Sequence, residues 1–193
     1  MSGTISINSR LIGQGHPTYI IAEMSGNHNQ DYGQAVKLIH AAKDAGVDAV
    51  KLQTYTADTL TINCDNEHFL IQETLWDGRT LYDLYGEAYT PWDWQPKLKE
   101  LADALEIDLF SSPFDNTAVE FLEGMNVPAY KVASFEIVDL PLLRCIAQTG
   151  KPIIMSTGMA SMSEIDEAVD TIRAAGGNQL AILKCNSAYP APP

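Results

Sequence analysis

The sequence has few cysteines, few basic residues and no long apolar run. Its three cysteines, Cys64, Cys145 and Cys185, are widely spaced along 193 residues. This spacing fits reduced thiols in a cytoplasmic protein and argues against a disulfide framework or a CxxC metal motif. Only 12 Lys and Arg residues stand against 25 Asp and Glu residues, which gives a formal net charge of −13. That balance argues against general nucleic-acid binding, which needs basic patches that neutralise phosphates.

No stretch approaches the roughly 20 apolar residues that a membrane-spanning helix needs. The N-terminus has no basic start followed by an apolar segment, so no signal peptide is predicted. Apolar residues make up 46% of the chain, a composition typical of a globular protein. We therefore expect a cytoplasmic globular protein with neither a membrane nor a nucleic acid as partner.

Apolar runs and helical patterns alternate regularly from residue 19 onward. Helix-capping signals occur at Asp31, Thr117, Asp139 and Ser161, each before an apolar stripe of helical spacing. Before this region, residues 4–8 and 10–14 suggest a small β-hairpin. The alternation predicts βαβ units and a parallel sheet. The runs that read as buried strands are 19–23, 49–54, 108–112, 129–134, 152–156 and 180–186.

Two architectures compete for this pattern, a doubly wound sheet and a (β/α)₈ barrel. No GxGxxG or GxxxxGK motif follows the first strand, which weakens a nucleotide-binding doubly wound sheet. Polar residues instead stand at strand ends, where a barrel places its catalytic groups. We therefore predict an α/β fold of the (β/α)₈ TIM-barrel type. These strand-end residues are Glu23, Lys51, Gln53, Ser112, Ser134, Glu136, Ser156 and Ser187.

A complete barrel has eight strands and about 250 residues. The six strands predicted here therefore indicate one barrel domain over residues 1–193, interrupted after its sixth strand. Residues 55–92 form a long lid-like insertion within it, with a short helix predicted by the spacing of Leu81, Leu84 and Tyr85. Tryptophans and tyrosines crowd this segment. They either pack the insertion on the barrel rim or also shape a sugar pocket.

Lys51 and Lys131 lie inside apolar, strand-like runs. Burial of an ammonium group is costly unless an anion pairs with it. For a single lysine a structural pairing with a carboxylate would suffice. Two such lysines among strand-end serines predict a site for a phosphate or a carboxylate. The serines concerned are Ser112, Ser134 and Ser156.

Glu23 and Glu136 are the candidates for acid–base chemistry beside such an anion. In an extended strand Ser134 and Glu136 share one face, whereas Lys131 and Ser134 converge only if the strand bends or ends before Ser134. His28, in a loop after the first strand, either orients a substrate or has no catalytic role. No HxH or HExxH motif or carboxylate cluster marks a complete metal site.

These residues also carry a resemblance to a known family. Residues 131–136 are its centre, and collinear motifs lie before and after them at 21–29, 50–54, 111–114, 154–159 and 183–190. Together they resemble the N-terminal barrel of the sialic acid synthase family. The insertion, with Leu75-Trp76 and Thr90-Pro91-Trp92, is similar to the pseudaminic acid synthase branch of that family.

The resemblance implies a transferase that condenses phosphoenolpyruvate with an open-chain acetamido sugar aldehyde. In the pseudaminic branch this sugar is 2,4-diacetamido-2,4,6-trideoxy-L-altrose, and phosphate leaves by C–O cleavage. By position, Gln53, Glu136 and Tyr189 would face the sugar, and Glu23 would assist proton transfer or water activation. The residues implied to bind phosphoenolpyruvate are Lys51, Ser112, Lys131, Ser134, Ser156 and Ser187.

The resemblance further implies a divalent metal (Mn²⁺, Mg²⁺ or Co²⁺) that polarises the aldehyde. In the family its histidine ligands come from the seventh and eighth strand regions, which lie beyond this sequence, so no metal ligand is assigned in this chain. A C-terminal antifreeze-like domain, which reaches the partner's site in a homodimer, is also expected only in a longer protein. Asn186 and Ser187 depart from the family pattern, which has a Thr-like residue and an Asn there.

Other interpretations stay open at this point. An N-acetylneuraminate synthase that uses N-acetylmannosamine is the nearest alternative. A Schiff-base aldolase of similar shape would use Lys131 or Lys184 as its nucleophile. A non-catalytic remnant would bind phosphoenolpyruvate or a partner without turnover.

Overall fold

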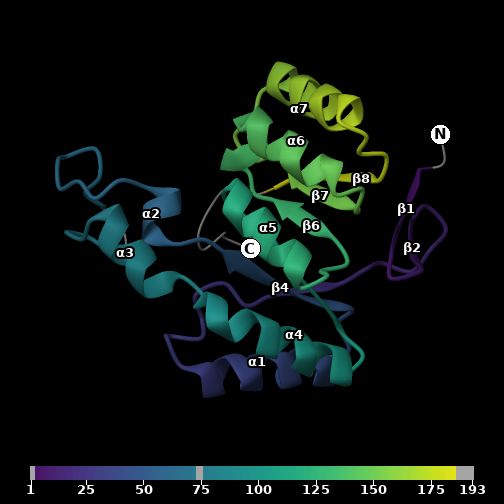
Figure 1. Cartoon of the computed structure of the whole chain (residues 1–193), viewed down its shortest axis with the longest axis horizontal. Helices are drawn as coiled ribbons and strands as arrows, with labels where there is room; N and C mark the ends of the chain where they lie inside the picture. Colours follow the sequence, from purple (N-terminus) through teal and green to yellow (C-terminus); the bar gives the residue numbers. More distant parts are fainter. Residues whose placement is uncertain (1–2, 73–75, 186–193) are drawn as a thin grey trace. The chain divides into compact units, whose positions relative to one another are not determined.

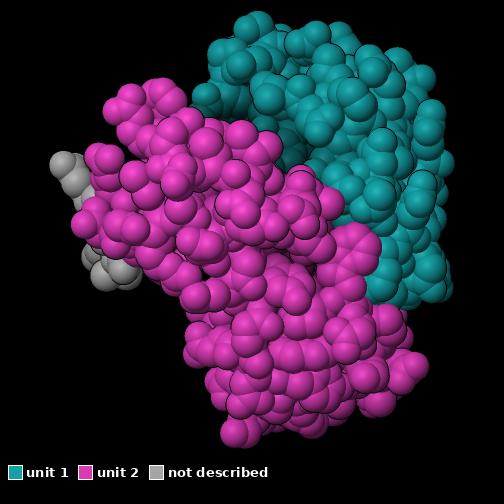
Figure 2. Space-filling view, turned by 60° about the vertical axis from the view of Figure 1, so that its left-hand side comes forward, with its two compact units in different colours: residues 1–19, 110–193 teal, residues 20–109 magenta. Residues whose placement is uncertain are grey.

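The computed structural model describes residues 3–72 and 76–185. The chain divides into two compact units, residues 20–109 and residues 1–19 with 110–193 (Figure 2). Unit 20–109, magenta in Figure 2, contains Glu23, Lys51 and Gln53. The other unit, in teal, contains the candidates from Ser112 to Ser156. Ser187 and Tyr189 lie outside the described residues.

Unit 20–109 begins with two parallel strands, β3 (Ile21–Glu23) and β4 (Ala49–Thr54), joined by helix α1 (Tyr32–Asp44). The Asp31 carboxylate accepts a hydrogen bond from the Gln34 backbone N–H at 3.2 Å, so the predicted N-cap is confirmed. Five of the six residues of β4 are buried. This near-continuous burial is what a parallel strand covered on both faces requires.

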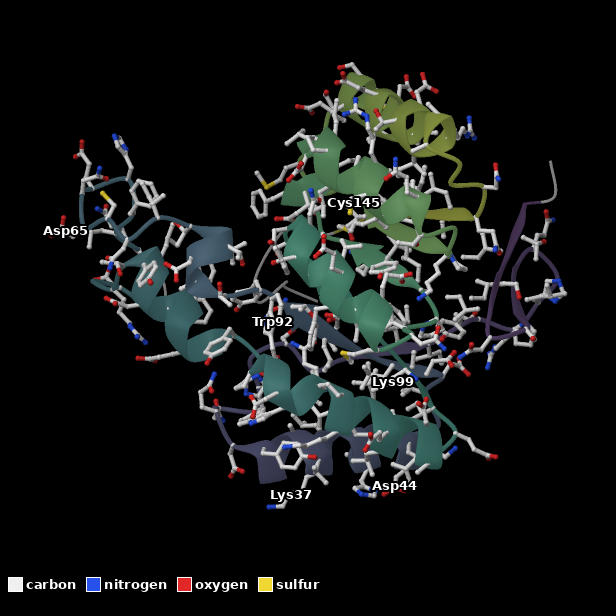
Figure 3. The ribbon with its side chains drawn as sticks, in the orientation of Figure 1. Lys37, Asp44, Asp65, Trp92, Lys99 and Cys145 are labelled. Atoms are coloured by element: carbon white, nitrogen blue, oxygen red, sulfur yellow. The ribbon has the colours of Figure 1, made fainter. Side chains whose placement is uncertain are left out.

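The rest of this unit contains the insertion and the helix that follows it. Its elements are α2 (Ala57–Leu60), α3 (Leu81–Ala88), η1 (Trp92–Trp94) and α4 (Gln95–Ala104). Helix α3 confirms the predicted short helix. Helix α4 packs beside α1 (Figure 1). Lys37 and Asp44 lie on the exposed side of α1 (Figure 3).

Unit 1–19 with 110–193 opens with the predicted hairpin, β1 (Thr4–Ile7) paired antiparallel with β2 (Arg10–Gly13). Its two turn residues, Asn8 and Ser9, both have positive φ, at 45° and 68°. Two successive positive φ values are the geometry of a type I′ turn, whose twist matches that of the flanking strands.

The same unit continues with parallel strands separated by helices. The strands are β5 (Asp108–Pro113), whose first two residues belong to the other unit, β6 (Tyr130–Val132), β7 (Ile153–Ser156) and β8 (Leu180–Leu183). The helices are α5 (Asn116–Gly124), α6 (Leu140–Gln148) and α7 (Met162–Ala174), with the 3₁₀-helix η2 (Phe135–Val138) after β6. Helices α6 and α7 pack side by side (Figure 1). Within this unit strand order follows chain order, β5-β6-β7-β8. The predicted α/β class is thus confirmed.

Two local predictions were wrong. The N-cap of α5 is Asp115, not Thr117, because the Asp115 carboxylate accepts hydrogen bonds from the backbone N–H groups of Thr117 and Ala118, each at 3.1 Å. The predicted strand 129–134 is shorter, since β6 ends at Val132 and Ser134 has helical φ and ψ of −65° and −36°. Among the described residues no helix is long and apolar enough to cross a membrane.

Candidate active site

In unit 20–109, Glu23, the last residue of β3, lies beside Lys51 of β4. They are register partners in the parallel pair β3–β4. The Lys51 Nζ lies 2.8 Å from the Glu23 Oε2, with the lysine side chain 7% exposed and the glutamate side chain 51% exposed. The buried ammonium thus has a carboxylate partner that reaches solvent. Gln53, half-buried two residues along β4, shares the Lys51 face by strand alternation.

In the other unit, Lys131 is 8% exposed and lies at the centre of β6. Its ammonium donates hydrogen bonds to the Ser156 Oγ at 2.5 Å and to the Val132 carbonyl at 2.7 Å. Lys131 pairs with Ile154 in the β6–β7 register, so the side chain reaches Ser156 two residues further on, at the end of β7. Both acceptors are neutral.

Ser112 lies beside this lysine. Ser111 is the register partner of Tyr130, which places Ser112 at the level of Lys131 in the β5–β6 pair. Ser112 is 1% exposed. The structure therefore brings together Ser112, Lys131 and Ser156, three of the predicted residues.

Ser134 and Glu136 reach the site differently from the prediction. Because β6 ends at Val132, the condition for Lys131 and Ser134 to converge is met. The shared strand face predicted for Ser134 and Glu136 is wrong, since Ser134 directly precedes η2 and Glu136 lies within it. The chain turns into a 3₁₀-helix at this point instead of continuing as a strand.

The Glu136 carboxyl group is held in a partly apolar environment. Burial raises its pKa, and a backbone hydrogen bond and the positive charge of Lys131 oppose this only in part, while Asp139 adds to the rise. Its Oε2 is the one buried side-chain oxygen or nitrogen without a hydrogen-bond partner among the residues that the structure describes. A carboxyl with a raised pKa beside a lysine is suited to proton transfer near neutral pH.

Cys185 was not among the predicted site residues, yet it lies beside Lys131, Ser134 and Ser156. It follows β8, where Leu183 is the register partner of Ser156, and its Sγ contacts the Leu183 carbonyl at 3.7 Å. Burial raises the pKa of the thiol, but hydrogen bonds from Ser156, the Thr157 backbone and Ser134, with the Lys131 charge, bring it below its ordinary value. The only sequence signal was its position close to Ser187, within one of the motifs.

His28 has a structural environment. The side chain is fully buried, both ring nitrogens have hydrogen-bond partners, and Trp94 packs against the ring. Burial lowers the pKa of the imidazole. Of the two interpretations of His28, direct contact with a substrate is therefore not supported.

Within residues 3–72 and 76–185, no group of three or more His, Cys, Asp or Glu side chains is arranged to hold a metal ion. The described residues alone thus do not fit the divalent metal that the resemblance implies. The chemistry proposed below is accordingly derived from this chain's own lysines, serines and carboxyl groups.

Parallel strands that carry polar side chains near their carboxyl ends are features of a TIM-barrel-type domain. Residues 38–193 match the model of the NeuB family, so the chain belongs to this family. It is 49% identical over 174 residues to the pseudaminic acid synthase of Helicobacter pylori, covering 90% of this chain and 51% of that protein. A pseudaminic acid synthase of Campylobacter jejuni is 46% identical over 172 residues, covering 89% of this chain and 50% of that protein.

Among solved structures, the N-acetylneuraminic acid synthetase of Leptospira borgpetersenii has a TM-score of 0.86 at 30% identity, covering 100% of this chain and 62% of that chain. The structure of a truncated 3-deoxy-D-arabino-heptulosonate 7-phosphate synthase of Thermotoga maritima has a TM-score of 0.63 at 14% identity, covering 93% of this chain and 55% of that chain. At this identity the similarity shows the fold alone. The chain spans about half the length of the curated relatives it matches.

Proposed function

We propose that the chain is the phosphoenolpyruvate-binding part of a sialic-acid-type synthase, with the precursor of pseudaminic acid as its sugar. The observation that carries the proposal is the buried Lys131 ammonium, which donates a hydrogen bond to Ser156 at the end of β7 and lies level with Ser112 of β5. An anion bound there would form a charge-assisted hydrogen bond, which is stronger than a bond to a neutral acceptor. Ser112, Ser134 and Ser156 would add hydroxyl donors.

The reaction joins phosphoenolpyruvate, an acetamido sugar aldehyde and water into a nonulosonic acid and phosphate. Carbon 3 of phosphoenolpyruvate forms a bond to the aldehyde carbon, and the aldehyde oxygen takes up a proton. Water adds at carbon 2 and loses a proton, after which the C–O bond to phosphate breaks. Glu136, with its raised pKa, is the candidate proton donor. Glu23, half-exposed beside Lys51, is the candidate base for the water.

The sugar follows from similarity. Identity is 46–49% to pseudaminic acid synthases, against 30% to the N-acetylneuraminic acid synthetase of Leptospira borgpetersenii. We therefore favour 2,4-diacetamido-2,4,6-trideoxy-L-altrose over N-acetylmannosamine, with Gln53 facing the sugar. The divalent metal and the homodimer remain proposals, and their ligands and contacts are expected from the half of the relatives that this chain does not match.

The test is phosphate release from phosphoenolpyruvate with Mn²⁺ and each sugar in turn. Release with the altrose derivative and not with N-acetylmannosamine is the expected result. Release with N-acetylmannosamine alone would overturn the choice of sugar. If neither sugar gives release, binding of phosphoenolpyruvate is measured by calorimetry, and absence of binding would overturn the proposal.

A further inference from the structure

Three buried hydrogen bonds link Thr54, Gln95, Thr90 and His28 in unit 20–109, and the proposed chemistry uses none of them. The Thr54 hydroxyl donates to the Gln95 Oε1 at 2.8 Å. The Gln95 Nε2 donates to the Thr90 carbonyl at 3.2 Å. The Thr90 Oγ1 lies 3.2 Å from the His28 Nε2. All four side chains are at most 1% exposed.

The backbone fixes the direction of the histidine bond. The Gln30 N–H donates to the His28 Nδ1 at 3.1 Å, so that nitrogen is the acceptor and the neutral ring carries its proton on Nε2. The Nε2–H therefore donates to the Thr90 hydroxyl. An imidazolium would place two N–H donors against each other at Nδ1. The chain of bonds thus requires one tautomer of a neutral histidine.

Further contacts bind the same two segments together. The Gln30 side chain donates to the carbonyls of Glu87 and Tyr89, at 2.9 and 2.6 Å. A Cβ on Gly26 would lie 3.2 Å from the Ala88 carbonyl, so the loop approaches the end of α3 closely. The loop after β3 is therefore fastened to the end of the insertion.

The start of the insertion is fastened as well. The indole N–H of Trp92, labelled in Figure 3, donates to the Tyr55 carbonyl at 3.1 Å. The Thr56 side chain caps α2 directly after β4. Both ends of the 55–92 segment are thus held against the ends of β3 and β4.

Two candidate residues stand next to the points of attachment. Glu23 is the last residue of β3, immediately before the loop that carries His28. Gln53 immediately precedes Thr54 in β4. A buried polar chain in which every group is satisfied specifies a single arrangement more strictly than apolar packing does. The chain of bonds therefore fixes the backbone from which both candidates project.

We propose that the Thr54–Gln95–Thr90–His28 chain positions Glu23 and Gln53 for the sugar substrate, which makes Thr90 a positioning residue of the site. This inference rests on the proposed function, because the roles of Glu23 and Gln53 come from it. Phosphoenolpyruvate should be affected little, because Lys131 lies in the other unit and Lys51 projects from β4, whose link through Gln95 reaches the Thr90 carbonyl and does not use the hydroxyl. Loss of the Thr90 hydroxyl is thus expected to weaken binding of the sugar more than binding of phosphoenolpyruvate.

The variants are Thr90→Val, which removes the acceptor for His28, and Thr90→Ser, which retains it. The matched control is Thr149→Val in the other unit, which removes a hydroxyl bond to the Ile146 carbonyl of 2.8 Å. Calorimetry gives the dissociation constants of phosphoenolpyruvate alone and of the altrose derivative at saturating phosphoenolpyruvate. Hydrogen exchange is followed in residues 24–31 and 52–56.

We expect Thr90→Val to weaken sugar binding about tenfold while its phosphoenolpyruvate affinity stays within about twofold. Thr90→Ser and Thr149→Val should match the wild type. Exchange in 24–31 should quicken only in Thr90→Val, while 52–56 should exchange as in the wild type, because the Gln95 bond to the Thr90 carbonyl is retained. Unchanged sugar affinity in Thr90→Val, or an equal loss in Thr90→Ser, would overturn the inference. If the wild type binds neither substrate, the proposed function fails, and unchanged exchange in Thr90→Val would then separately refute the coupling.

Discussion

Removal of the Ser156 hydroxyl is the sharpest test of the cluster formed by Lys131, Ser112 and Ser156. The variant Ser156→Ala takes away the 2.5 Å partner of an ammonium that is 8% exposed. A hydrogen bond to a charged group contributes about 1.5–3 kcal/mol, and the low exposure leaves little room for water to replace it. We therefore expect the free energy of unfolding to fall by about 2 kcal/mol. Affinity for phosphoenolpyruvate should also fall, by about tenfold, because one hydroxyl donor is lost.

The assay is denaturant unfolding, followed by calorimetry with phosphoenolpyruvate. Ser163→Ala is the control, since Ser163 is an exposed serine on α7 and its loss should cost at most about 0.5 kcal/mol. If Ser156→Ala were no less stable than this control, the Lys131–Ser156 bond would not contribute as reasoned. If its stability fell but its affinity did not, Ser156 would support Lys131 without contacting the substrate.

Four further predictions follow from the two units. Burial raises the Glu136 pKa, so the contribution of this carboxyl group to stability is complete below pH about 4.5 and is lost as pH rises. Glu136→Gln should therefore stabilise the protein at pH 8 and leave its stability unchanged at pH 4, as measured by unfolding curves. The same variant should suppress turnover, as measured by phosphate release. The His28 pKa is lowered, so stability should decline as pH falls below 6.5, and a pH-independent difference between wild type and His28→Gln would contradict this. Iodoacetamide at pH 7 should label Cys185, whose thiol pKa is lowered, before Cys145, whose thiol pKa is raised by burial and by nearby carboxylates. Phosphoenolpyruvate should slow the labelling of Cys185. Equal labelling rates of the two cysteines, measured by mass spectrometry, would contradict the placement of Cys185 beside Lys131 and Ser156. Borohydride with the sugar aldehyde should trap no adduct on Lys131, whereas a trapped imine would favour the aldolase.

Much of the fold could be predicted because its signals are local. Strand β4 was predicted with its observed bounds, since its run of apolar residues has the length and composition of a buried parallel strand. The Ser161 capping box of α7 is present as predicted. Lys131 was identified as unusual by its apolar neighbours alone, and its burial is confirmed.

What the sequence could not give depends on contacts between distant segments. Nothing in the run 129–134 indicates that β6 ends at Val132, so the environment of Glu136 was inferred from the wrong periodicity. Cys185 lies near Ser156 because β8 pairs with β7, a register that only the folded chain defines. His28 and its hydrogen-bond partner Thr90 are 62 residues apart in sequence, beyond any local pattern.

The most direct test of the central claim is phosphoenolpyruvate binding to the wild type and to Lys131→Met, measured by calorimetry. Methionine has a similar length and lacks the charge, so the comparison isolates the ammonium group. We predict saturable binding to the wild type and at least about tenfold weaker binding to Lys131→Met, with both proteins folded by circular dichroism. Equal affinity in the two proteins would contradict the assignment of Lys131 to the phosphoenolpyruvate site.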